Sequence, residues 1–562
     1  MYDRVTRREL LSTVGLSTAT AAFGDGVPGR LASVSGEDAS SDDGHEKTGI
    51  EAPQGVQTGD VTADRAIIWS RASCPARMYV EIATDEYFSD VRTVRGPAAL
   101  EVTDYTAKLD LQGLPSGETI YYRVIFESLV EPGVRSEPVE GSFRTPPSAD
   151  EDGAVRFVWG GDVAGQGWGI DRDRGGMTIF EAMRELDPDF FVHSGDAIYA
   201  DGPLPETIEL DDGATWNNVV TEAKAGVADT LAEFRGNYKY NFLDEHYRNF
   251  LSEVPMIPQW DDHEVVNNWY PGETLPEDDP HDVKSVNLLA ARGQRAFTEF
   301  MPIRSHDDSW DEHYDSFRYG SALEVFRLDL RSYRGPNTAT RNSEQSSETA
   351  ILGAEQLAWL KRSLAESDAT WKVVASDMPI GLVVTDGDYF EAIANTDGEP
   401  SGREFEIADL LSFLCAEEVR NVVWFTADVH YTAAHHYHPD RAQFTDFLPF
   451  WEFVTGPLHA GTFGPGELDD TFGPEVVFEK SPPEGEANLP PSDGLQFFGQ
   501  VDVDADSREM TVTLRDRDGA ELHSQTLVPG EYGTLDPAED GEDDDGAGDS
   551  DGDDGSNGED DD

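Results

Sequence analysis

Two patterns of hydrophobic and polar positions divide the chain. Between Gly55 and about Thr145, short apolar runs alternate with turn signals, and no strong helical period appears. Alternation over a few residues is typical of strands with one buried face, and regular short strands of this kind favour two packed sheets. We therefore predict a small all-β sandwich over 51–146, with strands in these runs: 66–72, 78–84, 105–114 and 120–129.

An acidic, proline-containing linker follows Thr145, and beyond it the spacing of the apolar residues changes. Apolar runs of strand length now alternate with segments of helical spacing, as in VRFVWGGD followed by TIFEAMREL. This order predicts an α/β domain over 153–530 that ends in β-hairpins. The predicted helices are 178–186, 354–367 and 405–418.

The two ends of the chain differ in composition from the two predicted domains. Residues 1–23 carry Arg7-Arg8, a mildly apolar stretch and then small residues, which resembles a twin-arginine export signal. A surface helix with a chance arginine pair is the alternative. Residues 24–50 are predicted to be a linker, and the acidic tail 536–562 to be disordered. We therefore expect a secreted or cell-surface protein, exported folded by the twin-arginine machinery and without a transmembrane anchor.

Composition narrows the classes of function. Hydrophobic residues make up 38% and aromatic residues 10% of the 562 residues, which excludes a wholly disordered chain. The net charge of −71 repels nucleic acid and anionic membranes, so we expect no nucleic-acid-binding surface. Such acidity, with most cations being arginine, suggests a halophilic protein, because molar salt screens charges beyond about 3 Å. Cys74 and Cys415 are too few for a cysteine-based zinc cluster and are expected to be unpaired, although one bridge is possible.

Candidate chemistry gathers at the ends of the predicted strands. Five apolar strands are each followed closely by an aspartate, and two of these aspartates have a histidine within two residues. In α/β sheets, ligands collect at the carboxyl ends of parallel strands. One such aspartate is more often a turn or cap residue, but five in one domain predict a metal site. They are Asp162, Asp196, Asp262, Asp377 and Asp428.

The motifs around these residues resemble the calcineurin-like metallophosphoesterases, and more closely the PhoD family of alkaline phosphatases. The relevant segments are Gly161-Asp162, Gly195-Asp196-Ala-Ile-Tyr199-Ala-Asp201, Asp261-Asp262-His263-Glu264 and Ala427-Asp428-Val429-His430. The stretch Thr58–Asp64 also looks like the opening of the PhoD N-terminal domain. The resemblance covers about 53–530. It implies a layered β-sandwich flanked by helices, preceded by a small sandwich of immunoglobulin or fibronectin type.

The resemblance also implies a dinuclear metal site. Its first metal would be held by Asp162, Asp196, Tyr199 and His430, and its second by Asp196, Asp262, Asp377 and Asp428. Asp196 would bridge the metals, since its motif lies between those of the two half-sites. A tyrosine ligand favours Fe³⁺, and an all-carboxylate site suits Ca²⁺, with Mn²⁺ or Mg²⁺ possible. The family often carries a cysteine after the first Gly-Asp, and this chain has none.

Three further residues are candidates for catalysis. His263, beside Asp262, is placed to protonate or stabilise the leaving oxygen, although a histidine that only orients the ligand is the alternative. Arg331 is a candidate phosphate clamp, and a structural salt bridge is an equal alternative. Asn267, or its neighbour Asn268, is a candidate phosphate contact.

We therefore expect secreted hydrolysis of phosphate esters by a metal-activated water. A phosphodiesterase acting on lipid or nucleotide esters, of phospholipase D type, is the alternative activity. A non-catalytic surface protein with a degenerate phosphatase domain is the alternative of another class. The residues that shape the pocket are expected in loops, at 201–230, 270–315 and 385–400.

Overall fold

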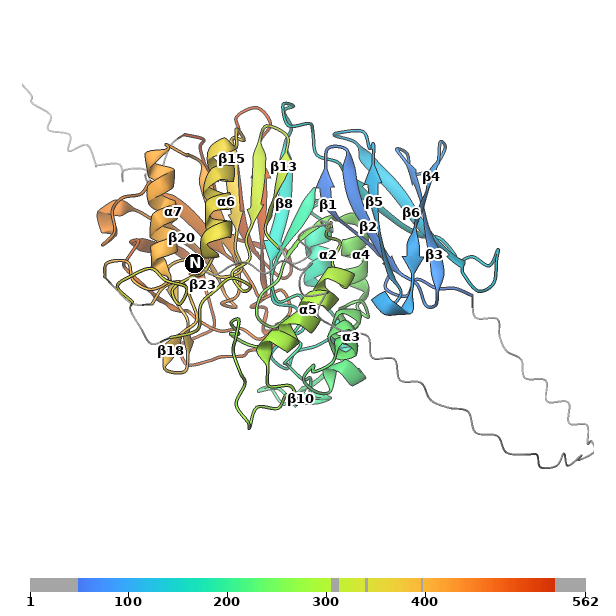
Figure 1. Cartoon of the computed structure of the whole chain (residues 1–562), viewed down its shortest axis with the longest axis horizontal. Coiled ribbons are helices and arrows are strands. Elements are labelled where there is room, and N and C mark those ends of the chain that lie inside the picture. The colour runs from blue at the N-terminus through green and yellow to red at the C-terminus, as the bar shows by residue number, and fades with distance from the viewer. Residues whose placement is uncertain (1–48, 305–312, 339–341, 396–397, 531–562) are drawn as a thin grey trace, which may run out of the picture. The chain divides into compact units, whose positions relative to one another are not determined.

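The computed structural model describes residues 49–304, 313–338, 342–395 and 398–530 (Figure 1). The predicted export signal, nearly all of the predicted linker and the acidic tail lie outside these ranges. Among the described residues, no helix combines the length and the apolar character needed to cross a membrane. Cys74 and Cys415 are both free thiols.

The N-terminal part is built from strands in two sheets. Each of the four runs predicted from alternation contains a strand, and apolar side chains such as Ile68, Val80 and Phe126 fill the space between the sheets. One sheet has the order β4-β3-β6-β7, and the strands β1, β2 and β5 belong to a larger sheet. The immunoglobulin or fibronectin type of this sandwich stays a prediction. The strands are β1 (Val56–Thr62), β2 (Arg65–Arg71), β3 (Ala76–Ala83), β4 (Arg92–Ala99), β5 (Thr106–Gln112), β6 (Thr119–Ser128) and β7 (Val139–Arg144).

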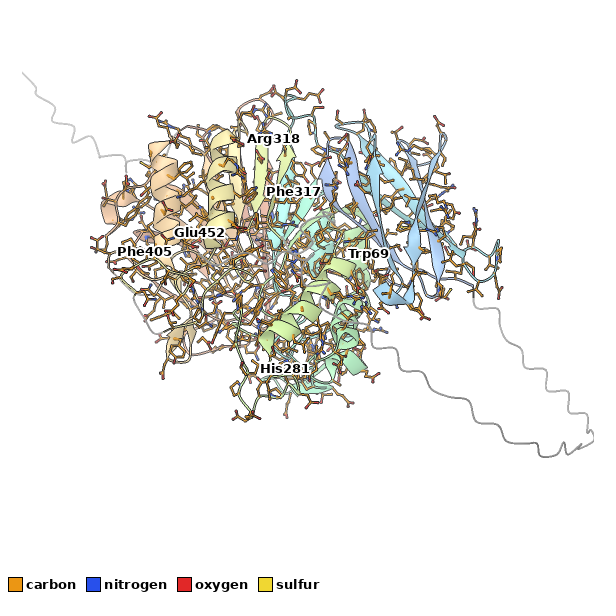
Figure 2. The ribbon with its side chains drawn as sticks, viewed as in Figure 1. Trp69, His281, Phe317, Arg318, Phe405 and Glu452 are labelled. Atoms are coloured by element: carbon orange, nitrogen blue, oxygen red, sulfur yellow. The ribbon has the colours of Figure 1, made fainter. Side chains whose placement is uncertain are left out.

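This sandwich shares a sheet with the α/β part of the chain. Strand β1 pairs in parallel with β12 (Met256–Gln259), with Gly59 opposite Met256. A Cβ atom on Gly59 would lie 2.6 Å from the carbonyl oxygen of Pro302, so only glycine permits this approach. Trp69 of β2, labelled in Figure 2, donates its ring N–H to the carbonyl of Glu299 over 2.8 Å. One sheet of the sandwich thus continues into the sheet that leads to the candidate site.

Two mixed sheets form the centre of the molecule. The larger has nine strands in the order β26-β25-β24-β8-β9-β12-β1-β2-β5, and the other has seven in the order β13-β14-β15-β19-β21-β20-β23. Strands β8, β9 and β12 run parallel to one another, as do β14, β15, β19 and β21. Their carboxyl ends therefore lie along one edge of each sheet. The strands are β8 (Val155–Gly160), β9 (Phe190–Ser194), β13 (Asp315–Tyr319), β14 (Leu323–Arg327), β15 (Trp371–Ala375), β19 (Val422–Thr426), β20 (Thr432–Tyr437), β21 (Phe450–Val454), β23 (Pro474–Lys480), β24 (Phe497–Val503), β25 (Met510–Asp516) and β26 (Glu521–Leu527).

Helices cover the outer faces of these two sheets. Between the sheets lies an aromatic core in which the rings of Phe157 and Phe190 stack at 4.8 Å. Apolar side chains of α2–α5 pack on the larger sheet, and those of α6 and α7 on the other. This arrangement confirms the predicted layers of sheet flanked by helices. The helices are α2 (Ile179–Arg184), α3 (Leu231–Asn241), α4 (Glu245–Glu253), α5 (Val286–Phe300), α6 (Gly353–Glu366) and α7 (Glu404–Ala416).

Helix α5 corrects one expectation, because it lies inside the segment 270–315 that was expected to be a loop. Its buried residues Val286, Leu289, Ala296, Phe297 and Phe300 recur at helical spacing and face the larger sheet. Burial of this apolar stripe explains why the segment is helical.

Candidate metal centre

The backbone at the strand ends sets up the site. Asp162 follows β8, Asp196 follows β9, and Asp428 and His430 follow β19. All four adopt the left-handed backbone conformation, with φ of 69°, 50°, 66° and 61°. Non-glycine residues rarely adopt this conformation, and such outliers cluster at functional sites. The turns therefore direct these side chains together at the edge where the parallel strands end.

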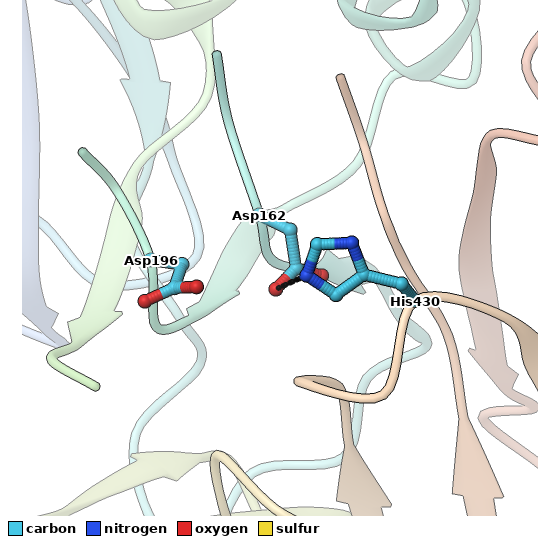
Figure 3. Close-up of side chains that lie close together, drawn as sticks. All are labelled: Asp162, Asp196 and His430. Atoms are coloured by element: carbon cyan, nitrogen blue, oxygen red, sulfur yellow. Dashed lines mark ion pairs between the residues drawn. The ribbon is translucent and has the colours of Figure 1, made fainter. Parts of the chain in front are cut away.

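Three overlapping groups of side chains come close enough to share an ion. Within each group, one potential ligand atom per residue lies within 4.8 Å of the others. Figure 3 shows the first group, in which Nε2 of His430 lies 3.5 Å from Oδ1 of Asp162. Asp196 and Asp262 each belong to two of the groups, as a bridging ligand would. The groups are Asp162 with Asp196 and His430, Asp196 with Asp262 and His263, and Asp261 with Asp262 and Asp428.

The carboxylates of this cluster lack the partners that buried anions need. Among the described residues, neither carboxylate oxygen of Asp162 has a hydrogen-bond partner, and the same holds for Oδ1 of Asp262 and Oδ2 of Asp261. Burial and then repulsion between neighbouring carboxylates raise the pKa of Asp162 and Asp196 well above the usual range. Buried carboxylates are normally paired or bind metal. The cluster thus fits cations with oxygen and imidazole ligands.

Tyr199 lies against this cluster and is 1% exposed. Its hydroxyl is 3.0 Å from Nε2 of His430. Gly165 makes room for the ring, since a Cβ atom there would lie 2.2 Å from Cε2 of Tyr199. Burial, and then the nearby charge of Asp196, raise the pKa of Tyr199 well above 10. A strong cation beside the hydroxyl would be needed to hold it as phenolate.

His263 is hydrogen-bonded through Nδ1 to a carboxylate outside the cluster, that of Asp201. Its Nδ1 lies 2.7 Å from Oδ1 of Asp201, while the other oxygen of Asp201 accepts the backbone N–H of Asn267 over 2.8 Å. Burial alone would lower the pKa of His263, but the charges of Asp201 and Asp262 raise it to about 9. The imidazole is therefore a cation near neutral pH, and it borders the open side of the cluster.

A cleft of about 440 Å³ opens beside the cluster. Asp196, Asp262, His263, Asn267 and Asn268 line its polar side. Its other wall is largely apolar and includes Leu382, Val383, Val384, Val429 and Phe463. A substrate in this cleft would therefore meet the carboxylates at one end and an apolar surface at the other.

Comparison with known proteins gives the family. The model of the PhoD-like phosphatase family matches residues 157–514, and that of the PhoD-like N-terminal domain matches 38–147. The chain belongs to the PhoD-like phosphatase family. It is therefore a phosphoester hydrolase.

Individual proteins similar to this PhoD-like chain are consistent with its family. Alkaline phosphatase D of Bacillus subtilis (strain 168) is 25% identical over 441 residues, which cover 74% of this chain and 71% of the relative. A solved structure of PhoD superposes with a TM-score of 0.64 at 21% identity, covering 86% of this chain and 91% of that one. The purple acid phosphatase PPD1 from yellow lupin (Lupinus luteus) seeds gives 0.52 at 13% identity, covering 85% and 74%. These two structures support the fold.

Two of the predicted site residues, Arg331 and Asp377, do not line the cleft. Arg331 is fully buried, and its Nε donates to Oδ1 of Asp261 over 2.6 Å. Its guanidinium also pairs with Glu391 and lies 3.4 Å from Asp377, which has no exposed surface either. This geometry favours the structural salt bridge over the phosphate clamp. Asp377 lies beside Arg331 and belongs to none of the three groups within the described part of the chain, although neither of its carboxylate oxygens has a hydrogen-bond partner there.

Two acidic residues of this region, Asp261 and Glu264, were not among the predicted site residues. Asp261 stands where a carboxylate was expected from Asp377, in a group with Asp262 and Asp428. Glu264 accepts the backbone N–H groups of Ala197 and Asp261 over 2.6 and 2.7 Å. It thereby joins the turns after β9 and β12. The run of four polar residues after a buried strand, 261–264, was the available signal.

Proposed function

We propose that the chain hydrolyses phosphate esters, as an enzyme of alkaline phosphatase type, at a dinuclear metal centre built from the clustered carboxylates. The observation that carries this proposal is the set of buried carboxylate oxygens without partners, in overlapping groups that are linked by Asp196 and Asp262. Membership of the phosphatase family supplies the reaction class.

The ligand sets suggest two different cations. Asp162, Asp196, Tyr199 and His430 would hold the first, and the phenol favours Fe³⁺ there. Asp196, Asp262 and Asp428 would hold the second, with Asp261 as a nearer candidate than Asp377. Oxygen ligands suit Ca²⁺, Mn²⁺ or Mg²⁺. When bound, the cations would neutralise phosphoryl charge and supply a nucleophilic water near neutral pH.

The surrounding residues would orient the ester and donate hydrogen bonds to its phosphoryl and leaving oxygens. His263, whose Nδ1 is hydrogen-bonded to Asp201, can donate a hydrogen bond from its protonated imidazole to a phosphoryl or leaving oxygen. Asn267 and Asn268 line the same side of the cleft and can contact phosphate. Arg331 would act indirectly by holding Asp261 in place.

A phosphodiester is a second candidate substrate. The apolar wall beside the cluster could accept an alkyl or aryl group. No Lys or Arg lines the cleft in the described part of the chain, which fits an ester with few negative charges. Membership of a phosphatase family argues against the non-catalytic alternative.

We also propose export by the twin-arginine route, on the strength of Arg7-Arg8 and the small residues after them. Function in high salt follows from the net charge of −71, because screening would relieve the self-repulsion of the chain.

Metal content and turnover test the proposal together. The purified protein, kept in high salt, is analysed for metals and assayed with a chromogenic monoester and a chromogenic diester. Asp196→Asn should remove most metal and activity and leave the fold intact. Asp469→Asn alters a buried aspartate outside the cluster and should keep both. Full metal content and turnover in Asp196→Asn would remove Asp196 from the site.

A further inference from the structure

A second cavity of about 260 Å³ lies apart from the catalytic cleft and shares no lining residue with it. Its walls come from segments far apart in the chain, including Arg174, Trp216, His459, Gln496 and Arg517. No Asp or Glu of the described residues lines it. In a chain with a net charge of −71, a cavity bordered by two arginines and free of carboxylates is unexpected.

The two arginines keep hydrogen-bonding capacity for a ligand. Arg517 has a buried Nε without a hydrogen-bond partner among the described residues. Its nearest carboxylate is Asp518 at 3.6 Å, and that of Arg174 is Asp171 at 3.4 Å. Both distances exceed those of charge-assisted hydrogen bonds. Arg517 donates its Nη1 to the carbonyl of Pro491, and Arg174 donates its Nη2 to the carbonyl of Thr215 over 3.3 Å, so the remaining N–H groups are the ones available to a ligand. Arg174 also lies over the ring of Trp216, at 5.6 Å from its centroid, so an aromatic surface supports its guanidinium.

The cavity wall also offers a buried acceptor. Gln496 is 1% exposed and donates its Nε2 to the carbonyl of Ala460 over 3.2 Å. Its Oε1 then has no hydrogen-bond partner in the described part of the chain. A buried acceptor of this kind costs free energy unless a ligand or water donates to it. The wall therefore combines cationic donors with a neutral acceptor.

We infer that this cavity binds inorganic phosphate at a site separate from the metal centre. The two guanidinium groups match the charge and the donor geometry that phosphate oxygens prefer. The acceptor at Gln496 suits the proton that phosphate keeps at neutral pH. Sulfate carries no such proton and would leave Oε1 of Gln496 unpaired. The site thus favours phosphate over sulfate.

The cavity adjoins the loop of the metal centre that carries Asp162. The backbone N–H of Leu458 donates to Gly161 over 2.8 Å, and that of His459 donates to Asp162 over 3.0 Å. Leu458 and His459 both line the cavity. A phosphate released by hydrolysis could therefore be retained close to the loop that carries Asp162 without occupying the catalytic cleft.

Equilibrium dialysis with radiolabelled phosphate tests this inference on the metal-loaded full chain. The wild type should bind one phosphate in the cavity in addition to any at the metal centre. Arg174→Gln combined with Arg517→Gln should weaken the cavity site by at least about a hundredfold, since each charge-assisted bond contributes on the order of 1.5 kcal/mol. Turnover of a small chromogenic ester should not change. The control variant combines Arg95→Gln with Arg135→Gln. It removes the same number of positive charges from the N-terminal sandwich and should leave phosphate binding intact.

Two further arms separate this site from the metal centre. Asp196→Asn should lose phosphate at the centre and keep the cavity phosphate, so failure of the proposed hydrolysis would not remove this site. An equal concentration of sulfate should leave the cavity phosphate bound to the wild type, and Gln496→Leu should abolish that preference. Unchanged phosphate stoichiometry in the double arginine variant, or equal displacement by sulfate in the wild type, would overturn the inference.

Discussion

Replacement of Arg331 by methionine gives the sharpest test of how the acidic centre is held together. Methionine keeps much of the length and volume of the arginine and removes its charge. Asp261 would lose a 2.6 Å hydrogen bond, and Glu391 would lose one of its two arginine partners. Both carboxylates are buried, with 0% and 1% side-chain exposure, so water cannot replace the lost interactions.

The expected cost is large. Removing one partner of a buried ion pair lowers the free energy of unfolding by about 3–5 kcal/mol. At about 1.36 kcal/mol for each factor of ten, the folding equilibrium should fall by roughly a hundredfold to several thousandfold. Arg184→Met is the matched control, because Arg184 pairs with Glu181 and Glu253 while its side chain is 30% exposed. Exposed pairs contribute about 0–1 kcal/mol.

Chemical unfolding of chelator-treated protein in constant high salt measures the difference between these variants. The Michaelis constant of the metal-loaded protein for a phosphate ester gives a second readout. If Arg331 is a structural ion-pair partner, stability falls in the metal-free protein, where no substrate can bind productively. An Arg331→Met protein that unfolds like the wild type but has a strongly raised Michaelis constant would refute this reasoning and restore the phosphate clamp.

Three other changes have defined outcomes. Tyr199→Phe should abolish a visible charge-transfer band and lower turnover while preserving the fold, because it deletes the phenol oxygen and keeps the ring; a coloured, fully active variant would exclude a tyrosine ligand. Glu404→Gln should flatten the dependence of stability on pH. Burial, and then Asp469, raise the pKa of Glu404 to about 9, so the wild type loses stability as the pH rises from about 4.5 towards 9, as thermal unfolding would show. Arg7→Lys with Arg8→Lys should leave the precursor inside the cell, and normal secretion in a fractionation assay would contradict the export signal.

Local patterns predicted many of the strands and the location of the candidate ligands. Alternation identified four strands of the N-terminal sandwich, β2, β3, β5 and β6, but not β1, β4 or β7. Aspartates after apolar runs marked Asp162, Asp196 and Asp428, because strand ends converge wherever parallel strands pair. Helix α5 was missed although its apolar spacing is regular. The parallel pairing of β1 with β12 could not be predicted, since it joins residues about 200 positions apart and depends on the complete fold.

The roles of individual polar residues were harder to predict for a related reason. Arg331, Asp377 and Asp261 are all polar residues near strand ends, and their sequence context does not distinguish the one that joins a candidate metal group from the other two. All three side chains are fully buried, so their contacts distinguish them: Asp261 lies with Asp262 and Asp428, whereas Arg331 pairs with Asp261 and Glu391 and lies 3.4 Å from Asp377. Such contacts depend on how the two sheets pack, which one sequence does not reveal.

The pairing of β1 with β12 has a consequence for protein engineering. A fragment that starts after the N-terminal sandwich would leave β12 as an exposed edge, two residues before Asp261. Unpaired edges of this kind recruit strands from other molecules and promote aggregation. By pairing with β12, the sandwich therefore covers the edge of the strand that precedes the Asp261–Glu264 segment. Trimming the enzyme to its smallest catalytic portion would require a redesigned edge, for example with a lysine on β12, which already contains Pro258.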